Sequence, residues 1–128
     1  MRFLLDTHSF LWFIGGNRRI SENAKATIAD LDNDIFLSVA SLWEIAVKIN
    51  IGKLKLPRPF GELIPEQLAQ EAIEVLPAEL LHLTQYVGLP LHHRDPFDRL
   101  IIAQAQVEAM PVIGTDAAFA SYDVDLLW

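Results

Sequence analysis

The sequence predicts an α/β fold in which a central, mostly parallel sheet of short strands is flanked by helices. Short apolar segments alternate with longer segments whose apolar residues recur at helical spacing. Most of the short segments are apolar, as strands buried on both faces of a parallel sheet are. The chain has 128 residues, of which 52% are hydrophobic, so a sizeable core is expected. At this length we expect a single domain spanning residues 1–128.

The expected elements follow in order along the chain. The strands are expected at Arg2–Leu5, Ile35–Leu37, Ile73–Leu76, Pro111–Ile113 and Val124–Trp128. The helices are expected at His8–Ile14, Lys25–Leu31 with a Ser21 cap, Ser38–Ile51, Phe60–Ala72, Ala78–Val87, Pro96–Met110 and Asp116–Ser121. Pro65 leaves open whether Phe60–Ala72 is one helix or two.

Composition excludes several classes of protein. A net charge of −7 argues against a protein that holds nucleic acid mainly by neutralising phosphates. Carboxylates that gather divalent cations can still act on phosphates, because the cations invert the local field. The absence of cysteine excludes disulfides and thiolate metal sites, and it fits the cytoplasm that we expect. No apolar run is long enough to cross a membrane, and the histidines fit no zinc motif.

Two aspartates directly follow expected strands. Asp6 ends the run RFLL, and Asp116 follows VIGT. Each can be the N-cap of the helix that comes next. Because the carboxyl ends of parallel strands meet at one edge of the sheet, the two carboxylates are also expected to lie at the same edge, where such sheets bind ligands.

Glu44 lies beside the main apolar stripe of the segment SVASLWEIAVKI. Small residues one turn earlier, Ala40 and Ser41, leave room for a ligand near its carboxylate. Lys48, four residues later, offers an exposed Glu–Lys pair instead. On this segment alone the exposed pair is the preferred interpretation.

Asp98 lies at the start of the helix face that is expected to pack into the core, since Ile101 and Ile102 follow it at helical spacing. An unpaired carboxylate there would cost free energy. Asp95 as N-cap, Pro96 at the first helical position and Asp98 at the third would begin the helix well. This capping arrangement fixes the direction of Asp98 and is compatible with metal binding.

These four acids come from separate elements that a doubly wound sheet can bring to one edge. Clustered carboxylates repel one another and raise each other's pKa. A hard divalent cation with oxygen ligands, Mg²⁺ or Mn²⁺, would remove that penalty. We therefore predict a metal site formed by Asp6, Glu44, Asp98 and Asp116.

The segments FLLDTHSFLW, SVASLWEIAVKINIGKL, HHRDPFDRLIIAQA and VIGTDAAFASY resemble the successive motifs of PIN domains, and in particular of VapC-type toxins. The resemblance spans nearly the whole chain and is weakest between Pro57 and Leu89. It implies a PIN-like three-layer fold and metal-dependent ribonuclease activity in which Asp6, Glu44, Asp98 and Asp116 are catalytic. It also implies a homodimer inhibited by an antitoxin. Alanines follow Asp116 where many relatives carry a further carboxylate, so the number of metal ions stays open.

The expected chemistry is phosphodiester hydrolysis by metal-activated water. Hydroxyl and carboxyl groups that could support the metal ligands are Thr7, Ser38, Thr115 and Asp95, for which capping is an equally good role. Residues that could contact RNA are Lys48, Lys53, Lys55 and Arg99, although a solvated loop and a surface helix arginine are the simpler interpretations. The large aromatic residues are expected mainly in the core: Trp12, Phe13, Trp43 and Trp128.

Two other functions are weighed against this one. A catalytically weak PIN-fold module that binds RNA or protein is the main alternative. A phospho-accepting receiver domain fits less well, because it needs paired acids near the first strand and only Asp6 is present.

Overall fold

The fold is described by a computed structural model that covers residues 1–128. The strands are β1 (Arg2–Leu5), β2 (Asp34–Ser38), β3 (Ile73–Leu76), β4 (Val112–Ile113) and β5 (Leu126–Leu127). The helices are α1 (Thr7–Gly15), α2 (Glu22–Ala29), α3 (Val39–Asn50), α4 (Phe60–Gln70), α5 (Leu80–Val87), α6 (Pro96–Glu108) and α7 (Ala117–Ala120). Each expected strand and helix is therefore present, with bounds that differ by a few residues.

The strands form one sheet in the order β3-β2-β1-β4-β5, and every neighbouring pair is parallel. Leu5 of the central strand β1 pairs with Leu37 of β2 on one side and with Ile113 of β4 on the other. The chain leaves β1 toward β2 and returns later to β4, so the strand order reverses between β1 and β4. The expected parallel α/β fold is confirmed.

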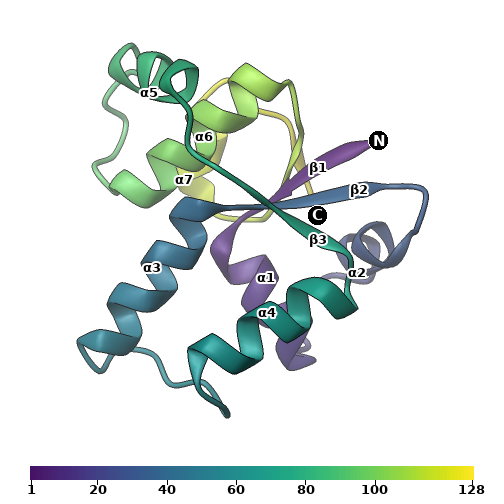
Figure 1. Ribbon diagram of the computed structural model, residues 1–128. Helices are drawn as coiled ribbons and strands as arrows, with labels where there is room; N and C mark the ends of the chain where they lie inside the picture. Colours follow the sequence, from purple (N-terminus) through teal and green to yellow (C-terminus); the bar gives the residue numbers. More distant parts are fainter.

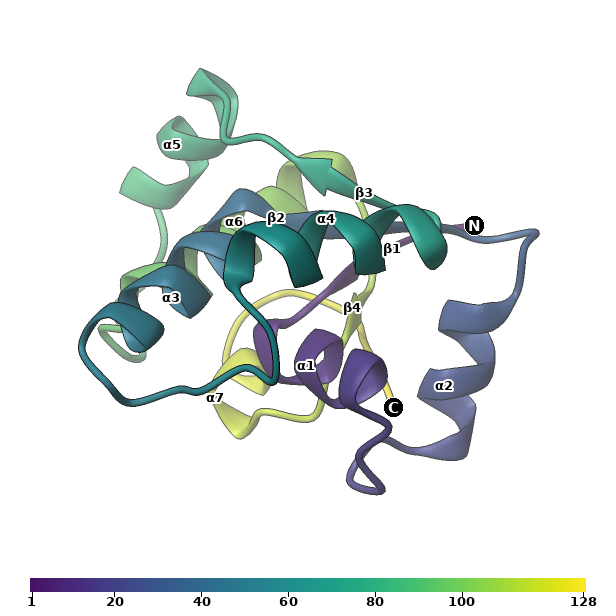
Figure 2. The same ribbon diagram turned by 60° about the horizontal axis from the view of Figure 1, so that its bottom comes forward.

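Side chains alternate between two cores along the strands. Phe3 and Leu5 pack with α1, α2 and α4 on one face, whereas Leu4 packs with α6 and α7 on the other. Figures 1 and 2 show these layers, with α5 and α6 on one side of the sheet and α1, α2 and α4 on the opposite side. Because both faces are covered, the strands are mostly apolar, and their charged residues are exposed.

A buried polar network joins β2, α5 and α6. Ser38 caps α3 and donates a hydrogen bond to Gln104, whose amide nitrogen donates to the carbonyl oxygen of Pro77 at 3.1 Å. His82 is fully buried, and its Nε2 lies 2.9 Å from Glu108. The hydrogen bond with His82 is the largest of the effects that lower the pKa of Glu108. The network fixes α6 against the end of β2, where α3 begins.

Two expectations about single residues were resolved by the structure. Pro65 lies inside one continuous helix, α4, rather than at the start of a second one. The expectation of a core position was wrong for Trp43, which is 60% exposed and meets the ring of Phe97 edge-on. Trp12, Phe13 and Trp128 do pack against the core. No helix combines the length and apolar character needed to cross a membrane.

Candidate active site

Asp6 is the first carboxylate at the carboxyl edge of the sheet. It follows β1 directly and caps α1, since its Oδ1 accepts a hydrogen bond from the backbone N–H of Ser9 at 2.7 Å. The residue is only 4% exposed, and this burial raises the pKa of its carboxyl group, against the opposing effect of Ser9. The capping role and the position at the sheet edge are therefore both present in one side chain.

The second oxygen of Asp6 lies against Gly114, the residue after β4. A Cβ atom at position 114 would stand 2.4 Å from Oδ2 of Asp6, closer than any real contact. A glycine is required here by close approach and not by backbone conformation, since its φ is not positive. Gly114 was not among the predicted site residues, although a glycine between a strand and a candidate aspartate is a recognisable signal.

Asp116 caps α7 by accepting a hydrogen bond from the backbone N–H of Ala118 at 2.9 Å. It lines one recess together with Asp6 and Thr115. The ends of β1 and β4 thus bring two of the predicted carboxylates to the same opening. Thr115 is exposed at this recess, where its hydroxyl is available to a ligand of the site.

Glu44 lies on α3 and is buried, with 4% of its surface exposed. Its Oε1 accepts a hydrogen bond from the hydroxyl of Thr7 at 2.7 Å, and its Oε2 lies 2.7 Å from Nζ of Lys48. The expected Glu–Lys pair exists, but the expectation that it is exposed was wrong for Glu44. Its burial comes from α1, which packs across α3 and brings Thr7 to the carboxylate.

Asp98 has the most informative electrostatics of the four. Its pKa is raised to about 7, first by burial and then by the negative charges of Asp95, Glu44, Asp116 and Asp6. The other three predicted site carboxylates therefore all lie within electrostatic range of Asp98. Such mutual repulsion is the property that a divalent cation would relieve.

The start of α6 surrounds Asp98 with fixed groups. Asp95 caps the helix by accepting from the backbone N–H groups of Phe97 and Asp98, at 2.9 and 3.1 Å, which confirms the predicted capping role. His93 places Nε2 3.5 Å from Oδ2 of Asp98, and its Nδ1 lies 2.8 Å from the hydroxyl of Tyr122. His93 was not among the predicted site residues.

The expectation of a surface arginine was wrong for Arg99, which is only 4% exposed. Its guanidinium donates to the carbonyl oxygen of Pro90 at 2.9 Å and to the hydroxyl of Tyr122 at 2.9 Å. The side chain holds the loop before α6 in place and is not free to contact RNA.

In the basic cluster formed by Lys48, Lys53, Lys55 and Arg58, two of the four cations are held in ion pairs. Lys48 pairs with Glu44, and Arg58, which follows the loop lysines, pairs with Glu66. Lys53 and Lys55 are exposed in the α3–α4 loop and form no ion pair. Ser38 points to Gln104 and caps α3, so it supports α3 and not a ligand of the site.

The donor set fits a hard divalent cation in its chemistry, although no three of these side chains converge on one point as they stand. Three of the carboxylates are held by local partners: Asp6 and Asp116 by helix N–H groups, and Glu44 by Lys48. Carboxylate oxygens are the ligands that Mg²⁺ and Mn²⁺ prefer, and the raised pKa of Asp98 marks a position where a cation would relieve an electrostatic cost. Binding of a cation by this set would require side-chain rearrangement.

Comparison with known proteins identifies the family. The model of the PIN domain matches residues 3–125, so the chain belongs to the PIN domain family. Ribonuclease VapC16 of Mycobacterium tuberculosis is 34% identical over 58 residues. That match covers 45% of this chain and 41% of the relative, so the chain aligns with less than half the length of this curated relative.

Solved structures share the fold at low sequence identity. A chain in the crystal structure of VapBC2 from Rickettsia felis, bound to a DNA fragment from its promoter, matches with a TM-score of 0.72 at 18% identity, covering 99% of this chain and 98% of the other. A chain of VapBC-1 from nontypeable Haemophilus influenzae matches with a TM-score of 0.67 at 16% identity, covering 99% and 97%. A chain of FitAcB from Neisseria gonorrhoeae matches with a TM-score of 0.66 at 18% identity, covering 98% and 96%. These matches establish the PIN-like three-layer architecture.

Gly114→Ala should displace the carboxylate of Asp6, because the added Cβ occupies the space of Oδ2. We expect a modest loss of stability, about 1 kcal/mol from the disturbed cap, and a loss of Mn²⁺ affinity of at least about tenfold. Calorimetric titration and thermal unfolding measure the two effects. Gly61→Ala on α4 is the matched control, since nothing lies within 4 Å of its added Cβ. Equal Mn²⁺ binding by Gly114→Ala and wild type would contradict the assignment of Asp6 as a metal ligand.

Asp98→Asn should stabilise the metal-free protein at pH 8 and not at pH 4. An acid whose folded pKa is raised binds more protons folded than unfolded, so stability falls as the pH rises from about 4 to about 7. Allowing for solvent screening, we expect a gain of about 1–2 kcal/mol at pH 8. Thermal unfolding of both proteins across this pH range is the measurement. An unchanged or lower melting temperature for the variant at pH 8 would show that Asp98 is not held at an electrostatic cost.

Proposed function

We propose that this chain is a divalent-metal-dependent ribonuclease and the toxin of a type II toxin–antitoxin pair, acting as a single domain in the cytoplasm. The observation that carries the proposal is the placement of acids at the carboxyl edge of the sheet, where Asp6 and Asp116 line one recess. Nearby, burial and then the negative charges of Asp95, Glu44, Asp116 and Asp6 raise the pKa of Asp98 to about 7. Helix capping accounts for Asp6 and Asp116, but it does not account for the unfavourable environment of Asp98. A cation that binds a phosphate would.

The residues have distinct roles in this proposal. Asp6, Asp98 and Asp116 would hold Mg²⁺ or Mn²⁺, and Glu44 would ligate it directly or through water, or accept the proton of the attacking water. Thr7 orients Glu44 through its hydrogen bond at 2.7 Å. Lys48 lies beside the same carboxylate, where it is also placed to meet a substrate phosphate. The cation, when bound, supplies Lewis-acid stabilisation of phosphate charge and a more acidic water.

The toxin assignment draws on the relatives. The similar solved chains come from VapBC and FitAcB complexes, and the matched curated relative is a VapC ribonuclease. The whole-length structural correspondence supports a comparable role for this chain with its own antitoxin. The RNA that it cuts is left to experiment.

A homodimer is proposed through helix α5. Leu80, Leu83 and Val87 recur at helical spacing and are 80%, 48% and 85% exposed. Large apolar side chains that share an exposed helix face are typical of protein interfaces. A second copy of the same helix would cover this face symmetrically, as most homodimers do.

Wild-type protein should cleave single-stranded RNA in the presence of Mg²⁺ or Mn²⁺ and lose the activity with EDTA. Asp98→Asn should cleave at least about 100-fold more slowly, since a proposed ligand is lost. Asp95→Asn is the matched control, because asparagine retains the N-cap while the same charge is removed three residues away. Gel assays of purified proteins decide the question. Equal cleavage by Asp98→Asn and wild type would leave a PIN-fold binding module as the better assignment.

Val87→Glu should convert the proposed dimer into a monomer, because it buries a charge in the interface. Light scattering coupled to size-exclusion chromatography measures the mass directly. Leu31→Glu replaces another exposed leucine, 92% exposed beyond the end of α2, and should leave the dimer intact. A wild-type protein that is monomeric at micromolar concentration would disprove the assembly.

A further inference from the structure

Trp12 of α1 borders three neighbouring recesses. The first, of about 250 Å³, contains Asp6, Asp116 and Arg19. The second, of about 340 Å³, lies between α1 and the start of α2, and the third, of about 370 Å³, lies between α1 and the α3–α4 loop. Figure 2 shows α1 between α2 on one side and this loop on the other. We call these three recesses together the Trp12 trough.

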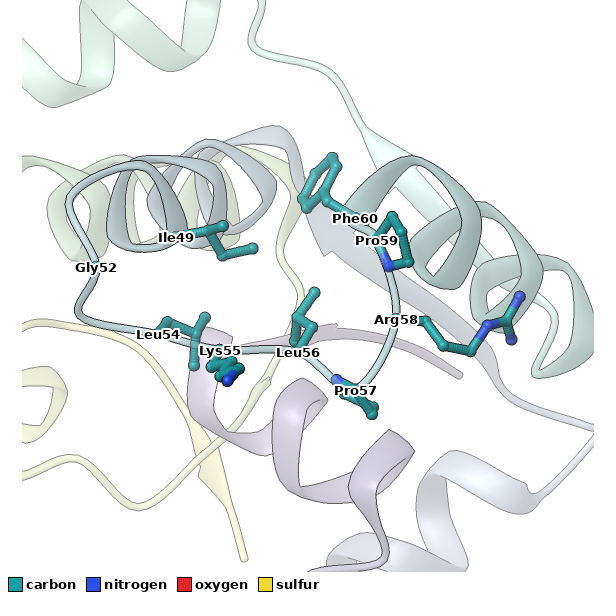
Figure 3. A pocket seen from close by; sticks show the side chains of 9 residues that line it. All are labelled: Ile49, Gly52, Leu54, Lys55, Leu56, Pro57, Arg58, Pro59 and Phe60. Carbon is teal, nitrogen blue, oxygen red and sulfur yellow. The ribbon is translucent and has the colours of Figure 1, made fainter.

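The trough extends from the candidate active site to the far side of the α3–α4 loop. His8 lines both the first and the third recess. Leu54, Lys55 and Leu56 line the third recess and also a further cavity of about 480 Å³, shown in Figure 3, where the loop passes over α1. An extended ligand that entered at the carboxylates would therefore contact Trp12 next and then the α3–α4 loop.

Unpaired cations gather around the trough, although the protein as a whole is acidic. Of ten Lys and Arg side chains, three form ion pairs with carboxylates and a fourth, Arg99, is buried. Four of the remaining six line the recesses that Trp12 borders: Arg18, Arg19, Lys25 and Lys55. This distribution favours a ligand that carries several negative charges along its length.

The aromatic side chains supply a second recognition element. Trp12 is partly buried, with its ring 5.8 Å from Trp128 in an edge arrangement and 5.9 Å from His8 at a tilt of 38°. The edge contact with Trp128 holds the indole in place, while the indole still lines the open recesses. Aromatic rings beside cations are the means by which proteins bind unpaired bases along a nucleic acid backbone.

We propose that Trp12 and Arg19 form a nucleotide subsite beside the carboxylates, in which an unpaired RNA base stacks on Trp12 and a flanking phosphate meets Arg19. The proposal rests on the ribonuclease function above and adds to it the two side chains that hold a nucleotide beside the carboxylates. Bases inside a duplex cannot enter a recess of this size, whereas a splayed base can.

The experiment measures RNA binding in the cleavage-deficient Asp98→Asn protein, with a short single-stranded RNA and a copy carrying an abasic nucleotide. RNA should quench the tryptophan fluorescence of this protein, and Trp12→Leu should abolish most of the quenching and weaken binding about tenfold. Trp12→Phe should retain most of the affinity because phenylalanine also stacks. Trp43→Leu is the matched control, since this exposed tryptophan lines none of the recesses.

The abasic RNA separates stacking from a general structural effect. It should bind more weakly than intact RNA to the Asp98→Asn protein, but equally to the version that also carries Trp12→Leu. If Trp12→Leu folds, binds RNA as tightly as its parent and still binds abasic RNA more weakly than intact RNA, the nucleotide subsite is absent, and a protein segment becomes the better candidate for the Trp12 trough. In that case, cleavage of RNA by the wild type would overturn the subsite and leave the ribonuclease proposal intact. A wild type that neither cuts nor binds RNA would overturn both proposals.

Discussion

The parallel pairing of β1 with both β2 and β4 is the constraint on which the other features depend. It makes β1 the centre of the sheet and brings the residues after β1 and β4 to one edge, so Asp6 meets Gly114 and shares a recess with Asp116. Helices α1 and α3 leave the same edge and bring Thr7 to Glu44. One pairing pattern thus determines where the candidate site lies.

The fold offsets the charge that it gathers by giving most of the carboxylates a local partner. Helix N–H groups donate hydrogen bonds to Asp6 and Asp116. Glu44 pairs with a lysine and accepts a hydrogen bond from a threonine hydroxyl. Asp98 has only His93 at 3.5 Å, which is why burial and repulsion raise its pKa so far. The protein therefore keeps Asp98 in an unfavourable environment, as functional sites commonly do.

Local signals allowed the strands, the helices and the caps at Ser21 and Asp95 to be predicted, because apolar spacing and capping depend on neighbours in sequence. Contacts between distant segments were not predictable in this way. The burial of Glu44 comes from Thr7, and that of Arg99 from Tyr122. The pairing of Arg58 with Glu66, which divides the basic cluster, likewise requires the position of α4. For the site, the sequence indicated which acids to consider, and the structure added Gly114, His93 and Arg19 around them.

The network of Ser38, Gln104 and His82 has a consequence for how the sequence can vary. All three side chains are fully buried. Ser38 donates to Gln104, Gln104 donates to a backbone carbonyl oxygen, and His82 pairs with Glu108. Replacing one of them therefore leaves buried polar atoms of its partner without a hydrogen bond. Single substitutions are disfavoured, and an exchange of the whole set for well-packed apolar residues is tolerated more easily. These positions are thus expected to covary during evolution as a unit, independently of the acids whose spacing they help to maintain.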